Sequence, residues 1–105
     1  MTRFARCDGP AEQVRYLVKE GDVPRMVFGT ATVMPGKRLP PRSFSLHERQ
    51  SEISYVIRGS CRFHGEKEVV ILSPGDVLYN PANTKHYVDN PYKEPCVVFW
   101  ALSET

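Results

Sequence analysis

The sequence GDVLYNPANTKHYVDN, residues 75–90, carries the most informative spacing in this 105-residue chain. A Pro-Gly turn leads into a short run of alternating residues, Val77–Asn80. Pro81–Thr84 is rich in turn residues, and Lys85–Asp89 again has the length and composition of a strand. The segment therefore predicts two short strands joined by a turn, with His86 at the start of the second strand.

The rest of the chain repeats this pattern of short strands and turns. Nine Pro and seven Gly interrupt runs of alternating or β-branched residues. Ala11–Glu20 is ambiguous between helix and strand, and its period-two pattern before the Gly21-Asp22 turn favours a strand. Further strands are expected at Arg25–Met34, Ser43–His47, Glu52–Ile57, Ser60–His64, Lys67–Leu72 and Cys96–Leu102. About eight to ten short strands predict an all-β sandwich or small barrel.

Two histidines and one glutamate are the best candidates for a chemical site. On one extended strand, His47 and Glu52 would lie about 16 Å apart on opposite faces, so they share a site only if the polar segment 48–51 turns. A closed barrel could bring His86 to the same mouth. Two imidazoles and one carboxylate suit Fe(II), Mn(II), Ni(II) or Zn(II) and leave positions for water, substrate or oxygen. The third histidine, His64, lies beside a predicted hairpin tip, where we expect it to be exposed.

The spacing of residues 75–90 resembles the second motif of the cupin superfamily, G-x5-P-x-G-x2-H-x3-N. Gly75, Pro81, His86 and Asn90 stand at the required intervals, and Asn83 replaces the inner glycine. Asn tolerates a positive φ better than most non-glycine residues. We therefore expect the turn to be retained.

The first cupin motif, G-x5-H-x-H-x3-4-E-x6-G, is matched less completely. Gly36, His47 and Glu52 align with it, as does the closing glycine. The gap after Gly36 is longer by three residues and contains Pro40-Pro41, and Ser45 stands where the first histidine is expected. These departures fall on the part of the motif that supplies metal ligands.

The resemblance covers residues 26–101 and implies a cupin double-stranded β-helix, a small antiparallel jelly-roll barrel with a metal inside. It also implies a ligand set, because cupins bind metal through the histidines and glutamate of these motifs. Carried over, the ligands are His47, Glu52 and His86. Ser45 does not match, since a neutral hydroxyl is a poor ligand for these metals. Three outcomes stay open: a three-residue metal site, a fourth group such as Tyr79 or a water held by Ser45, or a pocket that has lost its metal.

Several further residues could meet a substrate. Strand parity places Ser45 and Ser54 on the face of His47 and Glu52, where they contact substrate or simply fill space. Tyr79 is a candidate to donate a proton or bind a substrate oxygen, and the alternative is core packing. Four arginines surround the expected mouth in sequence and would suit an anionic substrate, unless they form a solvated surface: Arg38, Arg42, Arg49 and Arg58.

The composition excludes several classes of protein. Hydrophobic residues make up 41% and charged residues 25% of the chain, which is ordinary globular usage. A formal charge of +2 argues against nucleic acid as the main partner. No apolar run approaches the about 20 residues of a membrane span. Because Cys7, Cys61 and Cys96 are dispersed, they favour buried thiols in a reducing compartment, and we expect a cytoplasmic protein.

We expect a single cupin domain over residues 1–105. Its N-terminal strand or strands would lie within residues 1–24 and its barrel core within residues 25–102. The resemblance also implies a homodimer, since small cupins commonly pair. An exposed sheet edge is a natural pairing surface, and Ala11–Glu20 is the candidate contact.

The leading functional hypothesis is a metal-dependent enzyme acting on a small polar or anionic metabolite. The metal would polarise a carbonyl or enolate oxygen, or bind oxygen for oxidative cleavage. Small cupins that resemble this chain include dioxygenases, isomerases and lyases. The alternative is a non-catalytic module that binds a small molecule, and Ser45 is the best argument for a third option, a metal-free scaffold.

Overall fold

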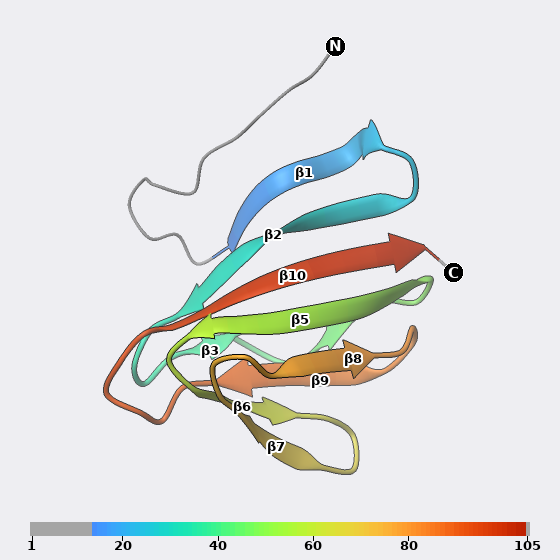
Figure 1. Cartoon of the computed structure of the whole chain (residues 1–105). Coiled ribbons are helices and arrows are strands. Elements are labelled where there is room, and N and C mark those ends of the chain that lie inside the picture. The colour runs from blue at the N-terminus through green and yellow to red at the C-terminus, as the bar shows by residue number, and fades with distance from the viewer. Residues whose placement is uncertain (1–13, 105) are drawn as a thin grey trace.

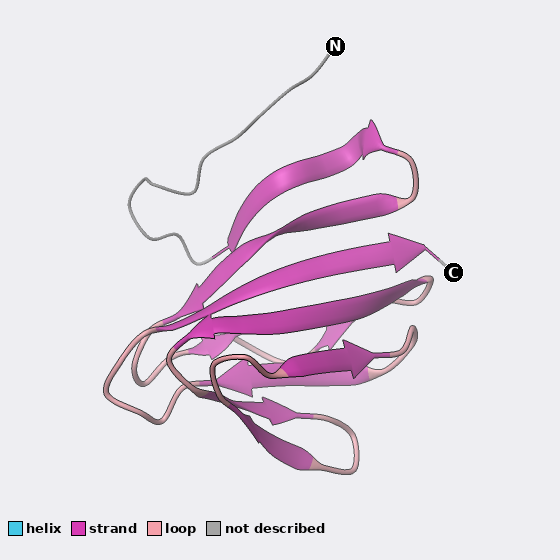
Figure 2. Cartoon of the chain, in the orientation of Figure 1, coloured by secondary structure: helices cyan, strands magenta, loops and turns pink. Residues whose placement is uncertain are grey.

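The structure, a computed structural model, describes residues 14–104. These residues form ten strands and no helix (Figure 2). The strands make two antiparallel sheets that lie against each other (Figure 1). The large sheet has the order β1-β2-β10-β5-β8, and the small sheet has the order β3-β9-β6-β7 with β4 paired to β9. The prediction of an all-β fold is confirmed.

The strand boundaries follow the turn residues of the sequence. In the large sheet the strands are β1 (Val14–Val23), β2 (Met26–Val33), β5 (Gln50–Arg58), β8 (Val77–Asn80) and β10 (Cys96–Glu104). In the small sheet they are β3 (Arg38–Leu39), β4 (Ser45–Leu46), β6 (Cys61–His64), β7 (Val69–Leu72) and β9 (Lys85–Asp89). Over the described residues, no helix with the length and apolar character of a membrane span is present.

Alternation along the strands places one set of side chains between the two sheets. In β10, Val98 and Trp100 are buried while their neighbours are partly exposed. The core contains residues from both sheets: Val33, Val56, Cys61, Phe63, Leu72, Cys96 and Val98. Burying a side chain of this size contributes about 1.5–3 kcal/mol, so this cluster holds the sheets together.

Three positive-φ turns hold the strands in register. Gly59 lies at φ +72°, and a Cβ there would stand 2.1 Å from the Pro95 carbonyl oxygen, so only glycine fits. Gly75 lies at φ +92°. Asn83 lies at φ 64°, which confirms that asparagine keeps the turn of the second motif.

One predicted turn was wrong, and one strand was not predicted. The predicted Gly21-Asp22 turn lies inside β1, which continues to Val23, and the chain reverses at Pro24 and Arg25 instead. Arg25 adopts φ 62° there. The unpredicted strand is β3, whose two residues pair with β9 immediately before the Pro40-Pro41 break. The predicted dimer contact, Ala11–Glu20, lies only in part within the described residues, because residues 11–13 lie outside them.

Candidate metal centre

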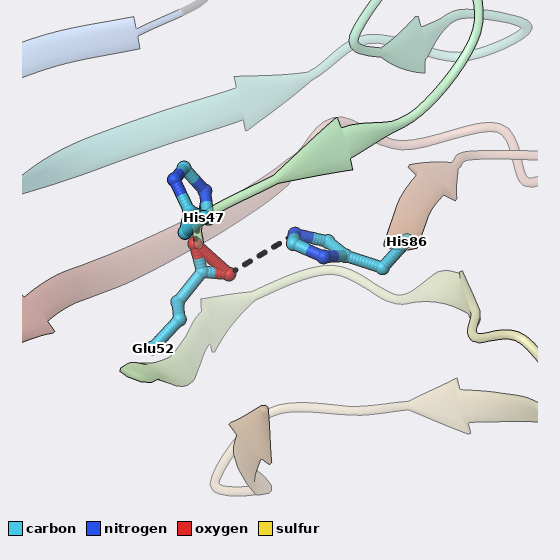
Figure 3. Close-up of side chains that lie close together, drawn as sticks. All are labelled: His47, Glu52 and His86. Atoms are coloured by element: carbon cyan, nitrogen blue, oxygen red, sulfur yellow. Dashed lines mark ion pairs between the residues drawn. The ribbon is translucent and has the colours of Figure 1, made fainter. Parts of the chain in front are cut away.

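His47, Glu52 and His86 come together between the two sheets (Figure 3). His47 directly follows β4, Glu52 lies near the start of β5, and His86 is the second residue of β9. One nitrogen or oxygen atom of each side chain lies within 4.8 Å of the other two. The chain therefore turns over residues 48–51, as the shared site required.

Backbone pairing explains why these three segments meet. β4 pairs with β9 so that Ser45 lies opposite His86. The backbone amide of Asn83 donates a hydrogen bond to the His47 carbonyl at 2.7 Å, which ties the turn of the second motif to the residue that follows β4. Glu52 lies opposite Asn80 in the pairing of β5 with β8. Both motifs are thus fixed by main-chain contacts beside the site.

The spacing of the ligand atoms fits a metal ion. Glu52 Oε1 lies 3.7 Å from His47 Nε2, and Glu52 Oε2 lies 3.4 Å from His86 Nε2. With metal–ligand bonds of about 2.1 Å, tetrahedral ligands stand about 3.4 Å apart. The exposed fraction of the side chains falls from 29% for His47 through 15% for Glu52 to 7% for His86. The group therefore runs from the accessible rim into the barrel.

The residues around His86 change its pKa and hold the orientation of its ring. Burial alone would lower the pKa of His86, but the hydrogen bond and negative charge of Glu52 outweigh burial and raise the pKa above its ordinary value. In the metal-free protein a proton therefore helps to hold this pair together. Metal binding would displace that proton, since a ligating histidine must be neutral.

Asn80 holds His86 from behind and was not singled out from the sequence. Its side-chain amide lies 2.8 Å from His86 Nδ1, and its Oδ1 accepts a hydrogen bond from Thr84 Oγ1 at 2.7 Å. The Thr84 carbonyl lies 3.4 Å from the same ring nitrogen. A partner on the second nitrogen of a ligating histidine fixes its ring orientation. With Nε2 on a metal, Nδ1 would carry a proton, and its acceptor would be the Thr84 carbonyl or, after rotation of the side-chain amide, Asn80 Oδ1. The available signal was a polar residue at an inward position of β8, just before Pro81.

The ligand group opens onto a cavity of about 250 Å³ inside the barrel. Its polar lining is concentrated beside the ligands, where Ser45 and Ser54 contribute hydroxyl groups. The rest of the lining is mainly apolar: Val14, Tyr16, Ala31, Val33, Leu39, Cys61, Phe63, Leu72, Leu78, Val88, Val98, Trp100 and Leu102. On β2, the side chains that face the cavity therefore include those of Ala31 and Val33.

The structure does not bring Tyr79 or the four arginines into this group. Tyr79 is 61% exposed and points away from the cavity, because its neighbours Leu78 and Asn80 point inward. Its hydroxyl lies 3.5 Å from Ser51 Oγ. None of Arg38, Arg42, Arg49 and Arg58 lines the cavity. Arg38 instead lies over the Tyr87 ring, 3.9 Å from its centroid.

His64 lies outside the group but is not exposed as expected. Its Nε2 pairs with Asp89 at 2.7 Å, and its ring stacks on Tyr87. Arg62 donates two hydrogen bonds to the same carboxylate. These bonds hold the pKa of Asp89 below its usual value, with His64 adding to the effect of Arg62. The Arg62–Asp89–His64 cluster stabilises the outer face of the small sheet.

Cys61 lines the cavity without offering a metal ligand. A hydrogen bond with Cys96, together with burial, raises the pKa of Cys61 far above its ordinary value. Its sulfur is not part of the group of ligand atoms formed by His47, Glu52 and His86. Both cysteines are buried and free, as expected, and Cys7 lies outside the described residues.

Comparison with known proteins identifies a family and a relative that are similar in sequence to this chain. The sequence profile of the family described as "Cupin domain" matches residues 29–102. A Vibrio cholerae protein named "Putative mannose-1-phosphate guanylyltransferase" is 33% identical over 64 residues, or 61% of this chain. The matched part is 13% of that protein, so the chain spans only a small part of the length of this curated relative.

Solved structures share the fold at low sequence identity. A "Cupin 2 conserved barrel domain protein" from Salinispora arenicola superposes with a TM-score of 0.78 at 18% identity, covering 100% of this chain and 90% of its own. A "predicted oxalate decarboxylase" from Thermotoga maritima gives 0.78 at 20% identity, covering 88% and 79%. At these identities the superpositions establish the barrel fold alone.

Proposed function

This chain belongs to the cupin family, and we propose that it is a metal-dependent enzyme that acts on a small molecule in its barrel cavity. One observation carries the proposal: the ligand atoms of His47, Glu52 and His86 lie within 4.8 Å of one another beside that cavity. A structural metal site would be closed by a fourth protein ligand. Because Ser45 stands where the family motif has a histidine, this site has three protein ligands.

We propose that the three residues hold a divalent transition metal: iron, manganese, nickel or zinc. The metal would supply Lewis-acid polarisation of a substrate oxygen or a binding position for oxygen. Three protein ligands leave coordination positions for exchangeable groups. The residues of the chain supply the rest: Asn80 orients His86, and the hydroxyl groups of Ser45 and Ser54 offer hydrogen bonds to a substrate.

The reaction proposed is of the oxygenase, isomerase or lyase type. These reactions share a need for an open metal position and a substrate shielded from water. The names of the relatives point to different reactions, a decarboxylation and a nucleotidyl transfer. These names therefore single out no one reaction or substrate for this chain.

Cobalt(II) titration of the apoprotein tests the proposal, because its visible absorption reports both binding and coordination. We expect one cobalt per chain and a change in the spectrum when azide is added, since azide occupies an open position. Glu52→Gln and His47→Ala should each weaken binding strongly. His64→Ala is the matched control, because His64 pairs with Asp89 on the outer face, and its cobalt affinity should equal that of the wild type.

The alternative functions give different outcomes in the same titration. Cobalt binding without any response to azide would indicate a closed structural site. Absence of binding in the folded protein would contradict the proposal and would favour a non-catalytic module whose cavity takes a small molecule without metal.

A further inference from the structure

The lining of the cavity indicates which kind of molecule the barrel accepts. Polar groups gather at one end, where Ser45 and Ser54 flank the three ligand residues. The wall beside and beyond them is built from aliphatic and aromatic side chains. Leu78 and Trp100 lie opposite Ser54 in the strand pairing, and Val98 lies farther along β10. Among the described residues, 14–104, no Lys or Arg side chain lines the cavity.

These features disfavour the binding of a polyhydroxylated or multiply charged substrate. Hydroxyl groups placed against the apolar wall would lose hydrogen bonds to water without replacement, which costs free energy. A second anionic group would find no cationic side chain to pair with among the described residues that line the cavity. One anionic or carbonyl oxygen is different, because a bound metal can meet its charge at the polar end.

We propose that the substrate is amphiphilic, with one oxygen-bearing head that binds the metal and an uncharged apolar body that fills the rest of the cavity. This proposal rests on the metal-dependent function above. It also replaces the expectation of an anionic substrate held by arginines. A cavity of about 250 Å³ limits the apolar part of the substrate to a short aliphatic chain or a single ring.

A homologous series of alkyl hydroxamates tests the proposal on the cobalt-loaded protein. The hydroxamate head binds the metal in every member, so differences in affinity report the body alone. From acetohydroxamate to hexanohydroxamate we expect affinity to rise about fourfold per added methylene. The trihydroxylated analogue of butyrohydroxamate should bind no more tightly than acetohydroxamate.

A matched pair of variants locates the effect in the cavity. Ala31→Leu fills space at the wall and should abolish the gain with chain length, while acetohydroxamate and cobalt still bind. Ala101→Leu is the control, because Ala101 alternates with the inward residues of β10 and does not line the cavity. It should keep the full gain.

The outcomes separate this proposal from the proposed function. If cobalt and acetohydroxamate bind but longer chains gain nothing, the substrate class is overturned and the metal site stands. If the trihydroxylated analogue binds best, the cavity is selective for polar bodies and the proposal is wrong. If cobalt does not bind, both proposals fail together.

Discussion

At the scale of single residues, the metal centre depends on how His86 is held from behind. Its Nε2 faces Glu52, while its Nδ1 meets the side chain of Asn80. A histidine free to rotate would lose part of the geometry that three ligands require. Asn80 is therefore a positioning residue for the site.

Removing that support should weaken metal binding without removing a ligand. We expect Asn80→Ala to lower metal affinity by about 10- to 100-fold, as partners behind a ligating histidine commonly do. Competition with a chromophoric chelator measures the change. Asn83→Gly is the control, since glycine also adopts the positive φ of that turn. Equal affinities for Asn80→Ala and wild type would show that Asn80 does not orient the ring.

Ser45 offers the opposite experiment, the addition of a ligand. It lines the cavity and lies opposite His86 in the β4–β9 pairing. We expect Ser45→His to bind cobalt more tightly than the wild type and to respond less to azide, because a fourth protein ligand takes an open position. Isothermal titration and absorption spectroscopy report the two effects. Unchanged affinity in a stable variant would mean that position 45 cannot reach the metal.

The residue types of the site could be predicted from the sequence, but some orientations were assigned wrongly or left open. His47, Glu52 and His86 stood at recognisable spacings, and the structure brings them together. Tyr79 was only a candidate, and the parity of β8 turns it outward. His64 is partly buried because Asp89 and Tyr87 approach it from a neighbouring strand, and no local pattern reveals such partners.

At the scale of strands and turns, backbone conformation sets which elements can meet. Gly59→Ala should lower the free energy of unfolding by about 3 kcal/mol or more, because left-handed strain adds to a clash with the Pro95 carbonyl oxygen. Gly75→Ala has open space around its Cβ and should cost only about 1–2 kcal/mol. Chemical denaturation compares the two. Equal losses would contradict the role assigned to the Pro95 contact.

The small sheet carries a pH-dependent contribution to stability. Because the pKa of Asp89 is lower in the folded chain than in the unfolded one, its contribution is present above the unfolded pKa of about 3.9 and is lost as pH falls through the folded pKa. Asp89→Asn should therefore be less stable than the wild type at pH 7, and this difference should shrink below about pH 4.

Urea denaturation across pH measures this contribution of Asp89. Glu48→Gln, at an exposed position, is the control and should show no such trend. A difference between Asp89→Asn and the wild type that stays constant down to pH 3 would exclude the ion-pair cluster as its source.

Strand positions were more predictable than strand faces. Val77–Asn80 and Lys85–Asp89 match the expected ranges, since Pro and Gly bound them on the sequence. Alternation in β2 defined two faces but not which one turns inward, because both contain apolar residues. Contacts with neighbouring strands decide which face of β2 turns inward. Gly29 allows the close approach of Arg15 and Trp100, and Ala31 and Val33 line the cavity.

At the scale of the whole molecule, two sheets enclose a polar metal end and an apolar interior. The spacing of turn residues predicted many short strands, and the resemblance of the two motifs to those of cupins implied the barrel. The volume and lining of the cavity depend on pairings across the full chain, such as β10 between β2 and β5. The volume and lining could not be predicted from local spacing, and they determine which substrates fit the cavity.

The central claim is that this barrel holds a metal through His47, Glu52 and His86. Plasma mass spectrometry of tag-free protein, beside His86→Ala purified in the same way, tests it most directly. The account predicts close to one transition metal per chain in the wild type and none in the variant, with both proteins folded by circular dichroism. Equal metal content in the two proteins, or none in the wild type after reconstitution with iron, manganese, nickel and zinc, would contradict it.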